Sequence, residues 1–375
     1  MHSFTREDPT QAPRVDPSVA AEILERCYGL VKGKSGHLLS LTGYEDVNFK
    51  VVDHESNGTN EHLGNVEQHY VLKISNPVEN RTFGLVEAQD LLAADVRAKG
   101  IPCAESIIRC DGKIWAHEQV TWTDPPDILP VRLLSFLPGA MLEKIGYSPE
   151  VYFALGTLIA DFHLATANFE NATYRQHHPY LCLERTEDFL DEIDYQLSEQ
   201  IIDQAKRDLL VNNISEFRTR FLAQRDRFEH GFIHSDFNET NVLLVRNGRD
   251  VQVTGLLDFG DSHYSCLVFD LVSAVLYMML DRDRNDGEWW TIGAHLIAGY
   301  QSRRTLPTID AQHILLAVRT RLCLSLAYGL RTARLRKREG GDCSYVLKTQ
   351  SNGWEVLKIL SEADEEEVGR RWKIK

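Results

Sequence analysis

Short apolar runs alternate with polar ones along the first third of the chain, a pattern typical of β-strands. The runs predict strands over residues 37–42, 47–52, 70–74, 114–121 and 131–136. Asp16 and Pro17 provide a helix N-cap and a first-turn proline ahead of apolar positions at helical spacing. Residues 81–99 show the same spacing and end before Gly100. We therefore predict a small antiparallel sheet with helix 81–99 packed on it.

From about residue 140 onward, apolar positions recur at the spacing of α-helices. Helices are predicted over residues 149–169, 186–194, 201–228, 270–279, 289–301 and 310–336. Short β-like runs interrupt them at 232–234, 242–245 and 251–257. Pro138-Gly139 breaks the chain between the two patterns. We expect an α+β, bilobal organisation in three parts: a flexible tail over 1–15, a sheet lobe over 16–137 and a mostly helical lobe over 138–375.

Composition and charge narrow the classes of partner. The 375 residues carry a formal charge of −14 without a long Lys/Arg block, which argues against nucleic acid and favours a cationic small molecule. The longest apolar stretch, 267–280, contains Asp270 and is too short for a membrane helix. No secretory signal is evident, so a cytoplasmic location is expected, with mitochondrial import left open. Nothing indicates an obligate protein partner.

Cysteine and histidine spacing predicts no zinc site. The seven cysteines form no CxxC pair, which is typical of reduced core residues. His230 and His234 are four residues apart, but a β-like run separates them. His163, in an apolar helix, is expected to be a core histidine. The locally basic helix near the C-terminus is expected to present a solvated face, carrying Arg319, Arg321, Arg331, Arg334, Arg336 and Arg338.

The chemistry concentrates in the segment His234-Ser-Asp236, Asn241 and Asp258-Phe-Gly. The order HxDxxxxN then DFG resembles that of protein kinases. Phosphoryl transfer needs hard oxygen ligands for Mg²⁺, which Asn241 and Asp258 provide at one end of a predicted hairpin with a turn at 247–248. Asp236, on the preceding loop, would accept or orient the proton of an attacking hydroxyl. His234 would brace that loop.

Nucleotide contacts are expected from the sheet lobe. Lys73 lies in the middle of a predicted strand, where it would meet the phosphates, and Glu87 on the next helix would pair with it. Gly43, with Asn48 supporting its loop, would cover the phosphates, although a plain hairpin turn is an equal alternative. Residues 133–137 would form the nucleotide-binding linker.

Acidic residues near the motif are candidates for binding a substrate ammonium group. They are Glu239, Asp261 and Asp270. Each could equally be a structural cap, and Asp270 in particular opens an apolar helical run.

The phrases HSDFNETNVLL, VTGLLDFGD, YVLKIS and LGTLIADFH resemble the aminoglycoside phosphotransferase superfamily. The short interval between Asp258 and Asp270 and the missing APE triplet separate the chain from protein kinases. The resemblance implies a bilobal protein-kinase-like fold and phosphorylation of a small-molecule hydroxyl with Mg²⁺. Further phrases, including VRLLSFLPG and the tyrosine of YMM, resemble members that act on 5-hydroxy-L-lysine, and so imply GTP, or ATP, as donor.

Other functions stay open from the sequence. The acceptor could be another hydroxylated amine or sugar, such as an amino alcohol, homoserine or an aminoglycoside, because the fold does not decide among them. A nucleotide-binding pseudokinase is a further alternative that the glycine-poor loop allows. A protein kinase is disfavoured by the missing activation segment.

Overall fold

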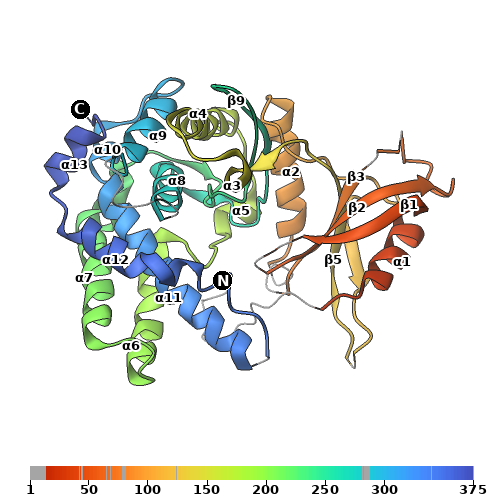
Figure 1. The fold of residues 1–375 in the computed structure, drawn as a ribbon, viewed down its shortest axis with the longest axis horizontal. Coiled ribbons are helices and arrows are strands. Elements are labelled where there is room, and N and C mark those ends of the chain that lie inside the picture. The colour runs from red at the N-terminus through yellow and green to blue at the C-terminus, as the bar shows by residue number, and fades with distance from the viewer. Residues whose placement is uncertain are drawn as a thin grey trace. The chain divides into compact units, whose positions relative to one another are not determined.

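The computed structural model describes residues 14–41, 43, 45–64, 66–67, 69–77, 82–123, 125–280, 282, 288–338 and 340–374. Their backbone contacts divide them into two compact units. The first holds the described residues of 7–94 and 104–137, and the second those of 95–103 and 138–375. Figure 1 shows the elements of each. In the part of the chain that is described, no helix is long and apolar enough to cross a membrane.

The first unit is built on a five-stranded antiparallel sheet with the order β1-β2-β3-β5-β4. Its strands are β1 (Leu30–Leu41), β2 (Val47–Ser56), β3 (His69–Ile74), β4 (Ala116–Gln119) and β5 (Ile128–Ser135). Helix α1 (Pro17–Tyr28) precedes the sheet, and α2 (Leu85–Ala98) follows β3. The predicted small antiparallel sheet is thus confirmed.

Helix α1 and one face of the sheet form the core of this unit. Asp16 caps the helix as predicted, because its carboxylate accepts from the Ser18 amide at 2.8 Å. The apolar side of α1 packs against buried side chains of three strands, among them Phe49, Leu72 and Leu133. Because strand side chains alternate between faces, polar positions such as Lys73 lie on the opposite face.

Strand β1 begins at Leu30, well before the predicted start at His37. The extra residues form an irregular edge pairing with a register shift. A Cβ on Gly33 or Gly36 would lie 2.5 or 2.6 Å from the carbonyl oxygen of Asp53. The close backbone approach requires glycine here, and glycine leaves no apolar alternation from which to predict a strand.

The second unit is mainly helical, with five short strands in two small sheets, ordered β10-β7 and β6-β8-β9. The strands are β6 (Ala140–Met141), β7 (His230–Ile233), β8 (Val242–Asn247), β9 (Asp250–Leu256) and β10 (His263–Cys266). The α-helices are α3 (Leu142–Ile145), α4 (Pro149–Ala165), α5 (Ala172–Gln176), α6 (Leu190–Ser198), α7 (Gln204–Arg220), α8 (Val268–Leu280), α9 (Thr291–Gln301), α10 (Thr308–Gln312), α11 (Ile314–Arg338), α12 (Lys348–Glu362) and α13 (Glu365–Arg371). The 3₁₀ helices are η2 (Leu183–Phe189) and η3 (Leu222–Arg227).

The arginines of α11 do not form the predicted solvated face. The buried ones are Arg319, Arg321, Arg331 and Arg336. Helix α11 packs against α7, α8 and α12, so most of its surface is enclosed. Carboxylates from other elements lie beside Arg319 and Arg321, which is how buried arginines are tolerated. The sequence prediction failed because these carboxylates lie far from the arginines along the chain.

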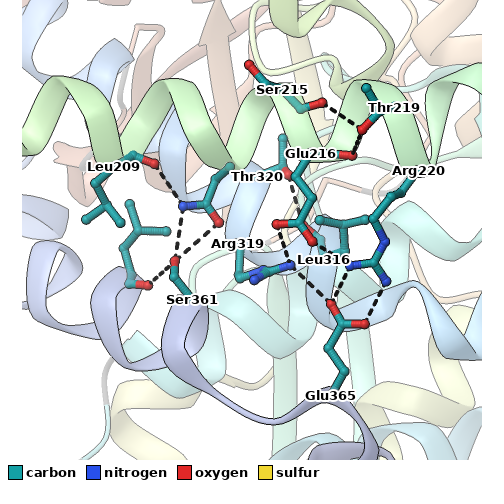
Figure 2. Close-up of polar contacts among 12 residues, drawn as sticks. Leu209, Ser215, Glu216, Thr219, Arg220, Leu316, Arg319, Thr320, Ser361 and Glu365 are labelled. Carbon is teal, nitrogen blue, oxygen red and sulfur yellow. Dashed lines mark hydrogen bonds and ion pairs between the residues drawn. The ribbon is translucent and has the colours of Figure 1, made fainter.

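Figure 2 shows one such network, which ties α7, α11 and the start of α13 together. The two carboxylate oxygens of Glu365 accept from Arg220 at 2.8 and 2.6 Å, and one of them is 3.3 Å from Arg319. Glu216 on α7 lies 3.3 Å from the same Arg319 nitrogen. Nearby, the Asn213 amide donates to Ser361 Oγ at 3.0 Å and links α7 to α12. These polar contacts join four helices of the second unit.

Candidate active site

The hairpin of β8 and β9 brings Asn241 and Asp258 to one end of the sheet β6-β8-β9. The Leu257 amide donates to the Asn241 carbonyl oxygen at 2.8 Å, so the residues flanking the two strands are adjacent. The predicted turn at Asn247-Gly248 is present at the other end, with Gly248 at a φ of 66°. The hairpin therefore places both expected metal ligands together.

Two asparagine side chains close the loop before β8 around Asp236. Asn241 Nδ2 donates to the Asp236 carbonyl oxygen at 3.0 Å and to its Oδ2 at 2.8 Å. Asn238 donates to the same Oδ2 at 2.8 Å, and its own Oδ1 accepts from the Thr240 and Asn241 amides at 2.9 and 3.0 Å. Asn238 was not predicted from the sequence. Its side chain accepts from the amide two residues later and so forms an Asx turn, for which an asparagine in a loop is the sequence signal.

Asp270 supports this loop from the first turn of α8. Its carboxylate oxygens accept from the His234 amide at 3.0 Å and the Ser235 amide at 2.7 Å, where Ser235 has a φ of 71°. His163 Nε2 lies 2.9 Å from the same carboxylate, and its Nδ1 is 3.0 Å from the Tyr300 hydroxyl. His163 is buried, as predicted for a core histidine. Asp270 therefore holds the strained loop backbone.

His234 lies beneath the loop in neutral form. The Asp236 amide donates to Nδ1 at 3.3 Å, and Nε2 is 2.9 Å from the Leu257 carbonyl oxygen. Because a carbonyl only accepts, the proton belongs on Nε2. Burial lowers the pKa of His234, and the ring packs edge-to-face on Phe162 and Phe259. Its position connects the loop to the residue before Asp258.

The Asp236 carboxylate is recessed, with 26% of its side chain exposed. Burial raises the pKa of Asp236 to about 7, helped by the negative charge of Asp261 and, more weakly, of Asp258. Arg321 opposes the shift from 3.8 Å away. Arg321 is a second residue that sequence analysis missed, because α11 is remote from the loop along the chain. A carboxyl group with such a pKa is able to exchange a proton near neutral pH.

Asp258 has a left-handed backbone with a φ of 61°, and its Oδ1 accepts from the Gly260 amide at 3.2 Å. Side chains of α5 and of the residue that follows it hold the two residues after Asp258. The Tyr174 hydroxyl donates to the Phe259 carbonyl oxygen at 3.0 Å, and His177 Nε2 is 3.2 Å from that of Gly260. The surrounding structure thus stabilises a conformation that an aspartate rarely adopts.

The arrangement of Asn241 and Asp258 fits a divalent cation. Asn241 directs its amide nitrogen toward Asp236, so Oδ1 is the atom that remains to ligate a metal. Asp258 adds carboxylate oxygens from the adjacent strand end. Hard oxygen atoms of this kind are the ligands that Mg²⁺ prefers.

Besides Asp270, two acids are candidates for binding substrate, and they differ in their surroundings. Glu239 is buried, and its carboxylate lies 3.0 Å from Lys348 Nζ. Lys348 also lies 3.4 Å from Glu143. The charge of Asp261, by contrast, acts directly on Asp236. Of the two, Asp261 is the one placed to influence the group that would meet a substrate hydroxyl.

In the sheet unit, Lys73 is buried and its ammonium group lies 2.7 Å from Asp46 Oδ2. Asp46 was not predicted, and it also accepts from the Asn76 amide at 2.8 Å. Glu87, the expected partner, is on the exposed side of α2. The helix instead turns Gln89 inward, where it binds Arg132 of β5. The helical phase of α2 explains why the carboxylate chosen from sequence points elsewhere.

The other residues expected at the phosphates lie near Lys73. Asn48 is directly opposite Lys73 in the β2–β3 pairing. A Cβ on Gly43 would lie 2.4 Å from the Asp46 carbonyl oxygen and 3.2 Å from Asn48 Nδ2, so only glycine fits there. The flanking Thr42 and Tyr44 lie outside the described residues.

The chain is similar in sequence to known proteins. The sequence profile of the phosphotransferase enzyme family (APH) matches residues 49–306. A mouse (Mus musculus) protein named hydroxylysine kinase is 28% identical over 365 residues, covering 94% of this chain and 91% of its own. A hydroxylysine kinase from Danio rerio is 24% identical over 366 residues, with 96% and 95% covered.

Solved structures share the fold at low sequence identity. An amicoumacin kinase, solved in complex with AMP-PNP, Ca²⁺ and Ami, has a TM-score of 0.66 at 13% identity, covering 94% of this chain and 97% of its own. A microcompartment-associated aminopropanol kinase has a TM-score of 0.66 at 18% identity, with 93% and 99% covered. The predicted protein-kinase-like fold, with an antiparallel sheet and a helical C-terminal part, is confirmed. The chain belongs to the APH phosphotransferase enzyme family.

Proposed function

We propose that the protein transfers the γ-phosphoryl group of GTP or ATP to the hydroxyl of 5-hydroxy-L-lysine. The observation that carries this proposal is the Asp236 carboxylate, held beside the oxygen ligands Asn241 and Asp258 by hydrogen bonds from Asn238 and Asn241. Phosphoryl transfer depends mainly on positioning and charge neutralisation, which this arrangement provides. The relatives named hydroxylysine kinase support the choice of acceptor.

Asp236 is the proposed proton acceptor. Its carboxylate would take the proton of the acceptor hydroxyl as the oxygen attacks the γ-phosphorus. Arg321 would limit the rise in the pKa of Asp236 and keep part of the population ionised at neutral pH. Asp270 would keep the loop in place through the His234 and Ser235 amides.

Asn241 and Asp258 would hold Mg²⁺, which supplies neutralisation of the triphosphate charge when bound. In the sheet unit, we propose that Lys73 contacts the phosphates, with Asn48 and Gly43 beside it. Asp46 is the carboxylate that would orient the lysine. Glu87 has no part in this proposal, since it is exposed on α2.

A second candidate acceptor class is amino alcohols. The matching folds include an aminopropanol kinase and an ethanolamine kinase. The charge of −14 and the Asp261 carboxylate near Asp236 favour any acceptor that carries an ammonium group. A pseudokinase is disfavoured because Asp236, Asn241 and Asp258 are all present and brought together.

The test is a matrix of purified full-length protein, Mg²⁺, either GTP or ATP, and hydroxylated amines. Nucleoside diphosphate release and phosphorylated acceptor are measured together. We expect rapid conversion of 5-hydroxy-L-lysine, with lysine inert because it lacks the hydroxyl. If only ethanolamine or aminopropanol is phosphorylated, the proposed acceptor is wrong and an amino alcohol takes its place. Nucleotide binding with no acceptor phosphorylated would overturn the catalytic proposal.

The matched controls are Asp236→Asn and Asp250→Asn. Both remove one carboxylate, but Asp250 is the first residue of β9, exposed at the turn at the other end of the hairpin from the proposed site. Asp236→Asn should lose turnover, whereas Asp250→Asn should keep it. Equal activity in the two variants would remove Asp236 from the proposed role.

A further inference from the structure

Three side chains with metal-binding atoms meet on one side of the two-stranded sheet β7–β10. They are Glu184 in the first turn of η2, His230 at the start of β7 and Cys266 at the end of β10. His230 and Cys266 face each other directly in the strand register. None of the three takes part in the proposed phosphoryl transfer. Asp236 and Asp270 lie further along the chain, after β7 and β10 respectively.

The separations among the three atoms are close to those of a tetrahedral metal site. Cys266 Sγ lies 3.5 Å from His230 Nε2 and 3.9 Å from Glu184 Oε1, and the last two are 4.0 Å apart. Zinc bonds of ordinary length at tetrahedral angles place S and N about 3.6 Å apart, S and O about 3.6 Å apart, and N and O about 3.4 Å apart. Small side-chain movements would therefore bring all three atoms onto one ion.

A hydrogen bond at Nδ1 of His230 fixes the orientation and the tautomer of its imidazole ring. His230 Nδ1 lies 2.9 Å from the Phe228 carbonyl oxygen, which only accepts, so Nδ1 carries the proton. Nε2 then directs its lone pair toward Cys266 and Glu184. Metal-binding histidines characteristically donate their second N–H to a carbonyl or carboxylate in this way.

Exposure and charge also suit an ion. Cys266 is fully buried, whereas 25% of the His230 side chain and 13% of the Glu184 side chain are exposed. A thiolate and a carboxylate together balance a divalent charge, and solvent can occupy a fourth position. Without metal, burial raises the pKa of the Cys266 thiol, so the S–H group donates to His230 instead.

We propose that Glu184, His230 and Cys266 bind one Zn²⁺ ion. Thiolate and imidazole ligands select Zn²⁺ over the hard Mg²⁺ ion. The ion would link η2 to β7 and β10, the strands that lead into the catalytic loop and into α8. Its effect is stabilisation of this region, separate from the transfer of phosphate. Sequence spacing predicted no zinc site because the three residues lie in three distant segments.

The test uses chelator-treated full-length protein with Zn²⁺, and Co²⁺ as a spectroscopic probe, in excess Mg²⁺. We expect one Zn²⁺ per chain, a higher melting temperature with Zn²⁺, and a sulfur-to-Co²⁺ charge-transfer absorption. Cys266→Ser should abolish that absorption, while Cys110→Ser, a cysteine of the sheet unit, should retain it. Absence of the absorption in the wild type, or its persistence in Cys266→Ser, would overturn the proposal.

Two further variants keep the test decisive if Cys266→Ser does not fold. His230→Gln and Glu184→Gln each remove one ligand from a partly exposed position. Each should weaken Zn²⁺ binding by more than about tenfold, a loss that changes around metal ligands commonly cause. Unchanged Zn²⁺ affinity in both variants would show that the metal binds elsewhere.

Discussion

Asp270 and Glu365 each gather several donors around one carboxylate, but they do so in different surroundings. Asp270 is fully buried and accepts from two backbone amides of the loop before Asp236, with His163 on the other side. Glu365 is about one-third exposed and accepts from the guanidinium groups of Arg220 and Arg319, as Figure 2 shows.

The difference lies in what each carboxylate holds. Asp270 fixes backbone within two residues of Asp236, so a change there should alter the position of the proposed proton acceptor as well as the stability of the fold. Glu365 joins α7 and α11 from a partly exposed position, where water is able to replace part of each contact. The same chemical group, a carboxylate, thus supports the proposed chemistry in one place and the packing in the other.

The largest effect is expected at Asp236, which lies in the loop that Asp270 holds. Asp236→Asn should reduce kcat by about 10²–10⁴-fold, the usual contribution of a positioned base. Burial and the charges of Asp261 and Asp258 disfavour ionised Asp236 in the fold. Its raised pKa therefore costs stability at neutral pH, and the variant should melt at an equal or higher temperature. Steady-state kinetics and thermal melts check both statements; a large loss of stability would contradict the second.

Asp270→Asn should lower stability by about 1–3 kcal/mol, the cost of leaving a buried donor without its acceptor. The asparagine side chain has a single acceptor oxygen. Its NH₂ group cannot accept, so the His234 or Ser235 amide would be left without an acceptor. We also expect a lower kcat with nucleotide affinity largely kept. Urea unfolding and kinetics on the same preparation measure the two effects. Loss of stability with an unchanged kcat would show that Asp270, like Glu365, acts only on the packing.

Acid should weaken the region around β10 before it weakens the Glu365 network. Burial lowers the pKa of His263 from 6.5 to about 3. The unfolded chain therefore binds a proton that the folded chain does not, and stability falls as the pH drops below 6.5. The loss reaches on the order of 2 kcal/mol at pH 5, at about 1.4 kcal/mol per pH unit.

The matched variant for this effect is His263→Asn, whose amide can still donate to the Asp261 carbonyl oxygen that His263 Nδ1 contacts. Urea unfolding between pH 7 and 5 should show a shallower loss in this variant. Arg220 lowers the pKa of Glu365 by hydrogen bonding. The stability from that pair is present above the ordinary glutamate pKa of 4.5 and is lost only below it. An equal slope in wild type and His263→Asn would exclude His263 as the cause.

The smallest effect is expected at Glu365 itself. Glu365→Gln should lower stability by no more than about 1 kcal/mol, because partly exposed ion pairs contribute little and Glu216 remains beside Arg319. kcat should not change. Glu366→Gln on the same helix, an exposed neighbour, provides the reference in urea unfolding. A loss as large as that of Asp270→Asn would show that the two carboxylates are equivalent after all.

Local patterns in the chain were sufficient for much of this protein. Alternating apolar runs indicated the antiparallel sheet, and the Asp16 cap marked the start of α1. The 241–258 interval indicated the hairpin that brings Asn241 and Asp258 together. Such features are set by neighbours within a few residues or by one turn, so the order of residue types carries them.

Contacts between distant segments were decided only by the tertiary structure. Asp46 rather than Glu87 meets Lys73, because the phase of α2 turns Gln89 inward. Arg321 lies beside Asp236 because α11 is enclosed by other helices.

By itself, therefore, the sequence determined most of the secondary structure, the family and the motif residues that carry the proposed chemistry. The tertiary structure decided which charges meet, including the Glu184, His230 and Cys266 cluster. The physical reason is that burial makes an unpaired charge costly, and the partner that offsets this cost comes from whichever element packs nearby, at any distance along the chain.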